Sequence, residues 1–198
     1  MESGKLLIAE PSVYGDQNFH RSIVIMAEHK DSGLLGFIIN KPLNYNISDV
    51  LTDIKRDFPL HYGGPVDQDN LFFIHNAGHL IPESLKIDDK LFWGGEFEKV
   101  IALVNEGVLS TKDIRFFLGY SGWSEDQLQQ EIGAHSWVVV DNAFESQILS
   151  HNTQELWKDQ MIALGGKYLV WSNTPRESPS QLIHQLVCKF KAKGFGNC

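Results

Sequence analysis

The stretch SIVIMAEHKDSGLLGFIIN, residues 22–40, decides the fold. Its two halves, residues 22–28 and 34–40, are rich in β-branched and other large apolar residues. Between them lies the polar segment 29–33, whose length and composition suit a β-hairpin. Neither half alternates cleanly between apolar and polar residues, which indicates strands covered on both faces. The stretch therefore predicts a hairpin inside a layered core.

Further short strands are expected on both sides of this hairpin. One ends at Tyr62, before the turn at Gly63-Gly64. The others are apolar runs bounded by turn residues, at 5–9, 71–75, 90–93, 114–119, 137–140 and 168–171.

Helices are expected where apolar residues recur at helical spacing. One such pattern covers 47–54 behind Asn46 or Ser48 as possible caps, a second covers 97–104 with Gly107 as its C-terminal cap, and a third covers 156–164. Ser124 with Gln127 three residues later forms a capping box that starts a fourth helix. Because strands and helices mix without regular alternation and neighbouring strands are joined as hairpins, an α+β fold is favoured over a doubly wound sheet.

The chain is expected to form one domain over residues 1–174, followed by a C-terminal tail, residues 175–198. The tail is expected to be helical, either docked on the domain or bound to a partner. Three lysines near its end, within 189–193, leave open the further alternative of a nucleic-acid-associated regulator. The apolar stripe of the tail consists of Leu182, Ile183, Leu186, Val187 and Phe190.

Composition narrows the class of protein. Of 198 residues, 42% are hydrophobic and 21% are charged, which is the balance of a folded protein in water. Acidic residues outnumber basic ones 25 to 17, and the net charge of −8 disfavours direct binding to nucleic acid or to anionic lipid. Two cysteines, Cys188 and Cys198, cannot form a disulfide framework. With no leader or membrane-spanning run in the sequence, we expect a cytoplasmic protein.

Two catalytic or metal-binding patterns are incomplete. Residues 119–123, GYSGW, approach a nucleophile elbow around Ser121, but Trp123 stands where that motif needs a small residue. His75 and His79 have a spacing suited to a metal on a helix, yet the surrounding residues predict a strand and a loop. No metal and no cofactor are therefore expected.

The neighbouring residues Glu28 and His29 leave one enzymatic alternative open. If they border a cleft beside residues 62–64, the carboxylate could orient or charge the imidazole for acid–base chemistry. The chain would then be a hydrolase or transferase that acts on an ester or a phosphate.

Several segments together resemble the YqgE/AlgH family of bacterial proteins. Their order and spacing agree over about residues 4–172. They are LIAEPS at 7–12, Asp16, FHRSIV at 19–24, Glu28-His29, Gly33, GFIINKPL at 36–43, YGGPV at 62–66, LGYSGW at 118–123, Gln127-Leu128, Glu131-Ile132 and Trp137.

The resemblance implies a bacterial, cytoplasmic α+β domain with a bifurcated mixed β-sheet, a small barrel-like part and surrounding helices. It brings a label of transcriptional regulator, which derives from a link to alginate production, and no established reaction. This sequence has no helix-turn-helix signature. It also has Ser121 where the usual family motif has alanine, which disfavours a catalytic role for that serine.

A non-enzymatic regulatory or adaptor protein is favoured over an enzyme, with an unidentified protein or small molecule as its partner. No membrane partner is expected, and the sequence does not specify an oligomeric state. Arg21 is predicted to contact an anionic group and Trp123 to form an apolar wall. The predicted binding residues lie in loops and at strand ends: Ser12, Asn18, His20, Arg21, Glu28, His29, Asn40, Gly63, Gly64, Tyr120 and Trp123.

Overall fold

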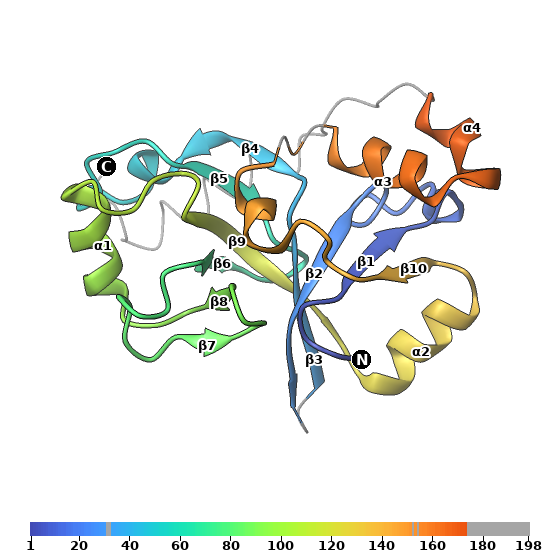
Figure 1. The fold of residues 1–198 in the computed structure, drawn as a ribbon, viewed down its shortest axis with the longest axis horizontal. Coiled ribbons are helices and arrows are strands. Elements are labelled where there is room, and N and C mark those ends of the chain that lie inside the picture. The colour runs from blue at the N-terminus through green and yellow to red at the C-terminus, as the bar shows by residue number, and fades with distance from the viewer. Residues whose placement is uncertain (31–32, 152, 154, 174–198) are drawn as a thin grey trace.

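The protein is built on a strongly curved, mixed β-sheet with helices around it (Figure 1). A computed structural model describes residues 1–30, 33–151, 153 and 155–173. The tail predicted over 175–198 lies outside the described residues. The strands are β1 (Leu6–Ala9), β2 (Ile23–Lys30), β3 (Gly33–Ile38), β4 (Pro42–Asn46), β5 (Pro59–Tyr62), β6 (Val66–His75), β7 (Leu85–Lys86), β8 (Phe92–Trp93), β9 (Ile114–Trp123) and β10 (Trp137–Val140).

The helical elements together contain fewer residues than the strands together. The α-helices are α1 (Phe97–Asn105), α2 (Glu125–Gly133), α3 (Leu156–Leu164) and α4 (Leu169–Ser172). Single 3₁₀ turns are η1 (Pro11–Val13), η2 (Ile47–Asp49), η3 (Glu145–Leu149) and η4 (Gly166–Tyr168). No helix in the described part of the chain is long and apolar enough to cross a membrane.

Strand β9 is the branch point of the sheet. The main path runs β10-β1-β2-β3-β9-β6-β8-β7, and its ladders are antiparallel. The pair β4–β5 leaves this path, because β5 runs parallel to β9 over Phe116–Leu118, while the end of β9 at Ser121–Trp123 pairs with β3. The predicted α+β fold with a bifurcated mixed sheet and a barrel-like part is confirmed.

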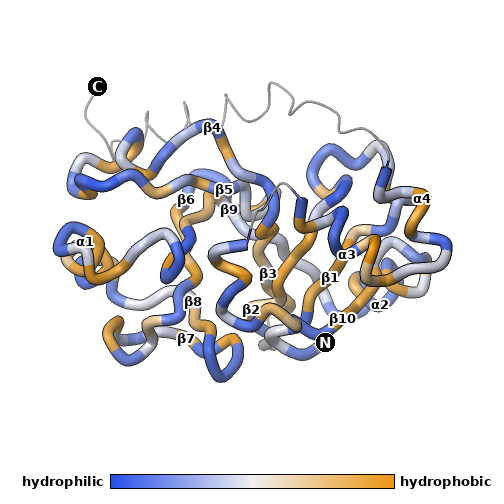
Figure 2. Tube along the Cα trace, turned by 45° about the horizontal axis from the view of Figure 1, so that its top comes forward, coloured by the Kyte–Doolittle hydropathy of each residue, from blue (hydrophilic) through white to orange (hydrophobic). Residues whose placement is uncertain are grey.

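Hydrophobic cores fill both faces of the central strands. In β1, Leu7 belongs to one core with Val24 and Phe116, whereas its neighbours Leu6 and Ile8 belong to the other. Figure 2 shows this concentration of hydrophobic residues along β1, β2 and β3. These strands lack alternating polar residues because both of their faces are buried.

Most predicted elements are confirmed, including the hairpin of β2 and β3 and the start of α2. The side chain of Ser124 accepts a hydrogen bond from the Gln127 backbone N–H at 3.2 Å. The Gln127 side chain donates to Glu131 at 2.9 Å, so the reciprocal half of the predicted capping box is not formed. Gly107 follows α1 with a positive φ of 79°, as a C-terminal cap requires.

Two predicted elements were wrong. The segment 47–54 forms only the turn η2, because the Asn105 side chain of α1 holds its end: it donates to the Asp53 carbonyl and accepts from the backbone N–H of Lys55, the residue after the segment. The apolar run 168–171 is not a strand but the end of η4 and most of α4. Its Tyr168 hydroxyl donates to Glu10 at 2.7 Å, a tertiary contact that periodicity in four residues cannot predict.

Candidate functional site

The loop between β1 and β2 is shaped by its own side chains. The Asp16 carboxylate accepts hydrogen bonds from the backbone N–H groups of Asn18 at 2.8 Å and Phe19 at 3.0 Å, forming an Asx-type turn. The Phe19 ring then packs 5.7 Å from the ring of Trp123 and 5.3 Å from that of Trp137. The local turn and the aromatic anchor together present Asn18 toward the sheet.

Lys41 joins this loop to the start of β4. Its ammonium group donates to the backbone carbonyl oxygen atoms of Asn18 at 2.6 Å and Gln17 at 3.3 Å. Burial lowers the pKa of Lys41 to about 8, and the nearby Asp16 carboxylate opposes part of this shift. Two of the three ammonium N–H groups are thereby used, and the third remains for another acceptor.

Tyr62, at the end of β5, holds the other side of the loop. Its buried hydroxyl donates to Asn18 Oδ1 at 2.7 Å and accepts a hydrogen bond from Gln68 Nε2 at 3.3 Å. Burial raises the pKa of Tyr62 to about 12, so the phenol keeps its proton at neutral pH. Its backbone N–H donates to the Lys41 carbonyl at 2.9 Å, which places the two residues side by side.

We call Asn18, Lys41, Tyr62 and Gln68 the Tyr62 network. Within the described residues, the Asn18 amide NH₂ has no acceptor, and one N–H of the Gln68 amide has none. Asn18 and Gln68 bond the phenol itself, and Lys41 bonds the Asn18 backbone, so three side chains linked through Asn18 and Tyr62 retain hydrogen-bond donors. A carboxylate, phosphate or carbonyl oxygen is the chemical group that complements such donors.

Arg21 and Asn40 fix the strand that follows the loop. The Asn40 side chain accepts from the Ile23 backbone N–H at 2.8 Å and donates to the Arg21 carbonyl at 2.9 Å. Arg21 has a positive φ of 54°, and its guanidinium carbon lies 4.8 Å from the ring centroid of Trp157 in α3. Asn40 therefore holds backbone, and the Arg21 side chain extends toward α3.

Gly63 and Gly64 permit close contact between the end of β5 and β9. A Cβ atom on Gly63 would lie 2.1 Å from the Gly119 carbonyl oxygen. On Gly64, which has a φ of 151°, it would lie 2.3 Å from Ser121 Oγ and from the Tyr120 backbone. Glycine at these two positions therefore allows the chain directly after Tyr62 to lie against β9.

The remaining predicted binding residues take no part in the Tyr62 network, although Ser12 and His20 belong to the same β1–β2 loop as Asn18. Ser12 donates to the His135 carbonyl at 2.9 Å, and His20 packs edge-on against Tyr14. Trp123 is buried, and its indole N–H donates to Glu131 at 3.0 Å.

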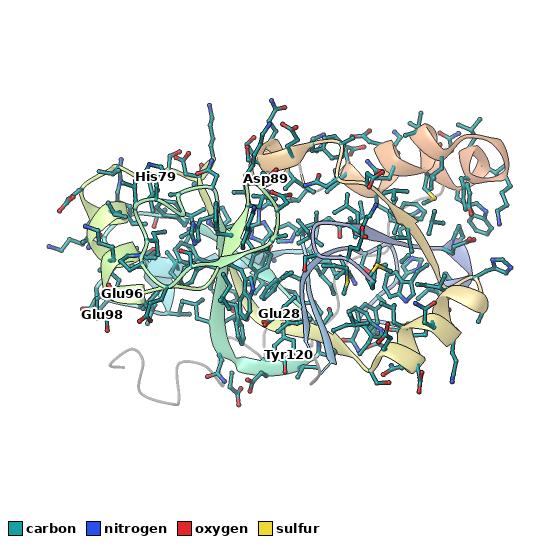
Figure 3. The ribbon with its side chains drawn as sticks, turned by 60° about the horizontal axis from the view of Figure 1, so that its bottom comes forward. Glu28, His79, Asp89, Glu96, Glu98 and Tyr120 are labelled. Atoms are coloured by element: carbon teal, nitrogen blue, oxygen red, sulfur yellow. The ribbon has the colours of Figure 1, made fainter. Side chains whose placement is uncertain are left out.

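Glu28 and Tyr120 lie away from α1 and its flanking residues. In Figure 3 both are near the middle of the view, whereas His79, Glu96 and Glu98 lie at the side of α1. Glu28 pairs with Leu35 and His29 pairs with Leu34 in the β2–β3 ladder. The structure thus brings Asn18, Arg21, Asn40, Gly63 and Gly64 around one loop, without gathering the whole predicted set.

His75 forms a buried polar cluster outside the network. Its Nδ1 accepts from the Ala77 backbone N–H at 3.2 Å, so the ring proton lies on Nε2, which contacts the Gly94 carbonyl at 3.1 Å and Ser84 Oγ at 3.2 Å. Burial lowers the His75 pKa to about 4. Both ring nitrogen atoms are engaged, and the described residues contain no cluster of three potential metal ligands.

Sequence reasoning missed most of the side chains that form the network. Lys41 and Tyr62 stand inside the family segments, and a lysine followed by proline next to an apolar strand is a signal that could have drawn attention to Lys41. Gln68 carries no such signal, because only the path of β6 brings it to Tyr62.

Comparisons with known proteins agree with this fold. A family model described as AlgH-like matches residues 6–169. The chain is 42% identical to a UPF0301 protein of Cytophaga hutchinsonii over 177 residues, covering 88% of this chain and 96% of the relative. It is 38% identical to a UPF0301 protein of Chlorobaculum parvum over 176 residues, covering 88% and 93%.

Two solved structures share the architecture. The crystal structure of protein DIP2367 from Corynebacterium diphtheriae superposes with a TM-score of 0.68 at 21% identity, covering 88% of this chain and 93% of that one. The solution structure of the AlgH protein from Pseudomonas aeruginosa gives a TM-score of 0.66 at 23% identity, covering 88% and 95%. At these identities the likeness concerns the fold.

Proposed function

The chain belongs to the AlgH-like family, and we propose that it is a regulatory binding protein of the bacterial cytoplasm that recognises a protein or small molecule. The single observation that carries this proposal is the Tyr62 network, with unused donors on Asn18, Lys41 and Gln68. Donors fixed around a buried phenol recognise acceptor oxygens without further chemistry. An effect on transcription would then pass through the bound partner.

Charge supports a partner other than nucleic acid. The net charge of −8 opposes a phosphate backbone, whereas a single carboxylate or phosphate group requires only a local cation, which Lys41 supplies. We therefore propose that the recognised group is an acceptor oxygen of a small molecule or of a protein side chain.

The arrangement of His75 and Ser84 disfavours hydrolysis there. Ser84 Oγ donates its proton to the Ile81 carbonyl at 2.7 Å, while the His75 nitrogen that faces it, Nε2, itself carries a proton. A histidine that holds a proton on the nitrogen facing a serine cannot remove the serine proton. This pair therefore stabilises the loop after β6.

The alternative of acid–base catalysis by Glu28 and His29 receives less support. The two residues occupy consecutive positions directly after a register shift between Met26 and Glu28, opposite Leu35 and Leu34. Consecutive positions of a strand belong to opposite faces, so the backbone does not favour a pair between them. Turnover of an ester or phosphate that is lost in the His29→Ala variant would establish this alternative instead.

Native mass spectrometry of the full chain, purified gently from bacterial cytoplasm, tests the proposal. We expect an additional bound mass, retained by the Lys55→Met variant and lost from Lys41→Met and Gln68→Ala. Lys55 is the matched control because it is an exposed lysine outside the network. Retention of the same mass by Lys41→Met and Gln68→Ala would show that the network is not the binding site.

A further inference from the structure

The last two helices carry apolar side chains at the surface. Ile162 of α3 is 48% exposed, and Leu169 and Val170 of α4 are 46% and 72% exposed. The two helices contact each other at one end of the molecule (Figures 1 and 2). Because the two helices are in contact, these exposed apolar residues lie on neighbouring elements, and such residues indicate an interaction site more than residues scattered singly do. We call Ile162, Leu169 and Val170 the α3–α4 patch.

The sequence that follows contains a matching apolar stripe. Leu182, Ile183, Leu186, Val187 and Phe190 follow the i, i+1, i+4, i+5, i+8 spacing of one helix face. Pro179 suits the first turn of such a helix, and Cys188 lies on the side opposite the stripe at 100° per residue. A stripe of this kind requires an apolar surface to cover it.

The connection between the two is short. The described chain ends at Asn173, directly after α4, and five residues later Ser178 precedes the stripe segment. Five residues span at most about 17 Å, and a helix of twelve residues is about 18 Å long. The segment therefore begins within reach of the patch.

We propose that residues 179–190 of this same chain form an amphipathic helix that docks on the α3–α4 patch. A connection of five residues gives the segment a millimolar effective concentration at the patch, which a second copy of the chain at ordinary concentration does not match. The family model ends at residue 169, so Val170 and the stripe lie beyond it, whereas Ile162 and Leu169 lie within it. Patch and stripe are therefore close in sequence.

Paramagnetic relaxation in the full chain tests this docking. The Cys198→Ser change leaves Cys188 as the single thiol for a nitroxide label, on the side of the helix away from the patch. We expect broadening of the backbone amide signals of α3 and α4 when label and ¹⁵N are in the same molecule. We expect no such broadening when labelled chains without ¹⁵N are mixed with unlabelled ¹⁵N chains.

Two variants of the same labelled chain complete the test. Leu186→Asp places a charge in the stripe and should abolish the broadening, whereas Gln185→Asp, outside the stripe, should leave it unchanged. Val170→Asp, at a highly exposed position that the fold does not need, should also abolish it. Absence of broadening in the parent chain, its persistence in Leu186→Asp, or its appearance in the mixed sample would overturn the proposal, the last by identifying a second copy as the occupant.

Discussion

The hydroxyl of Tyr62 donates a hydrogen bond of 2.7 Å to Asn18, which lies 44 residues earlier in the chain. This contact connects the end of β5 with the loop between β1 and β2. Since Lys41, directly before β4, holds the same loop through the Asn18 carbonyl, two side chains from different segments fix the position of the loop. The site therefore forms where the β1–β2 loop, the residue before β4 and the end of β5 meet.

Tyr62→Phe should weaken both the fold and recognition. The change removes a buried donor to Asn18 and an acceptor for Gln68, and we expect the free energy of unfolding to fall by about 1 kcal/mol. Urea denaturation measures this loss. Tyr120→Phe is the control, because the Tyr120 hydroxyl has no hydrogen bond within the described chain and its removal should change stability little. Equal effects of the two changes would contradict the assigned role.

Glu131→Ala should destabilise the protein through two tryptophans. One carboxylate oxygen accepts from the indole N–H of Trp123 at 3.0 Å and from that of Trp137 at 2.8 Å. Both indoles are buried, so their donors lose a charged acceptor, and we expect a loss of about 2 kcal/mol. Thermal unfolding followed by tryptophan fluorescence reports it, with Gln130→Ala, an exposed change on the same helix, as control. An unchanged melting temperature would count against this contact.

Gly63→Ala and Gly133→Ala should have opposite effects. A methyl group at Gly63 would meet the Gly119 carbonyl oxygen at 2.1 Å, so the crossing of β5 and β9 must open, at a cost of about 3 kcal/mol or more. A Cβ atom on Gly133 would meet no other part of the described fold within 4 Å, and alanine should stabilise α2 by about 0.5 kcal/mol. Chemical denaturation of both variants checks the contrast. A Gly63→Ala protein as stable as the parent would refute the close approach.

Stability should fall as the pH decreases from about 6.5 toward 4. Burial lowers the pKa of His75 to about 4 and that of His61 to about 3, from 6.5 in the unfolded chain. Below 6.5 the unfolded chain therefore binds protons that the folded protein does not, which favours unfolding. The stabilising contribution is complete above pH 6.5 and disappears as the pH approaches the folded pKa values.

His75→Gln should reduce this dependence on pH, by an amount on the order of 2 kcal/mol between pH 7 and pH 4. Urea midpoints measured across that range provide the test. The matched control is His79→Gln, because His79 is exposed and should leave the slope unchanged. A slope that is the same in all three proteins would show that His75 does not contribute.

Local patterns in the sequence were sufficient for much of the fold. The hairpin of β2 and β3, the Ser124 cap of α2 and the Gly107 end of α1 each depend on residues a few positions apart, and the structure confirms them. The extension of β9 beyond Gly119 was not predicted. Gly119 has a positive φ of 71°, and the strand continues through it to pair with β3. Whether such a glycine ends a strand or redirects it depends on the partner strands.

The candidate site shows the same division. Asn18, Gly63 and Gly64 could be selected from the sequence because they stand in recognisable segments, whereas Gln68 could not. Trp123 was expected as an apolar wall, and its aromatic neighbours Phe19 and Trp137 come from distant parts of the chain. The residue type predicts that a tryptophan is largely buried, but it does not predict which side chains pack against it.

The sequence by itself determined the strand-rich α+β class, the family and the local turns and caps, because these depend on periodicity and on short-range hydrogen bonding. Only the tertiary structure decided which side chains meet. Tyr62 reaches Asn18 and Gln68, and Asn105 prevents a helix at 47–54, through contacts between segments that the curvature of the sheet brings together. Such contacts depend on the packing of the whole chain, which no local stretch of residues encodes.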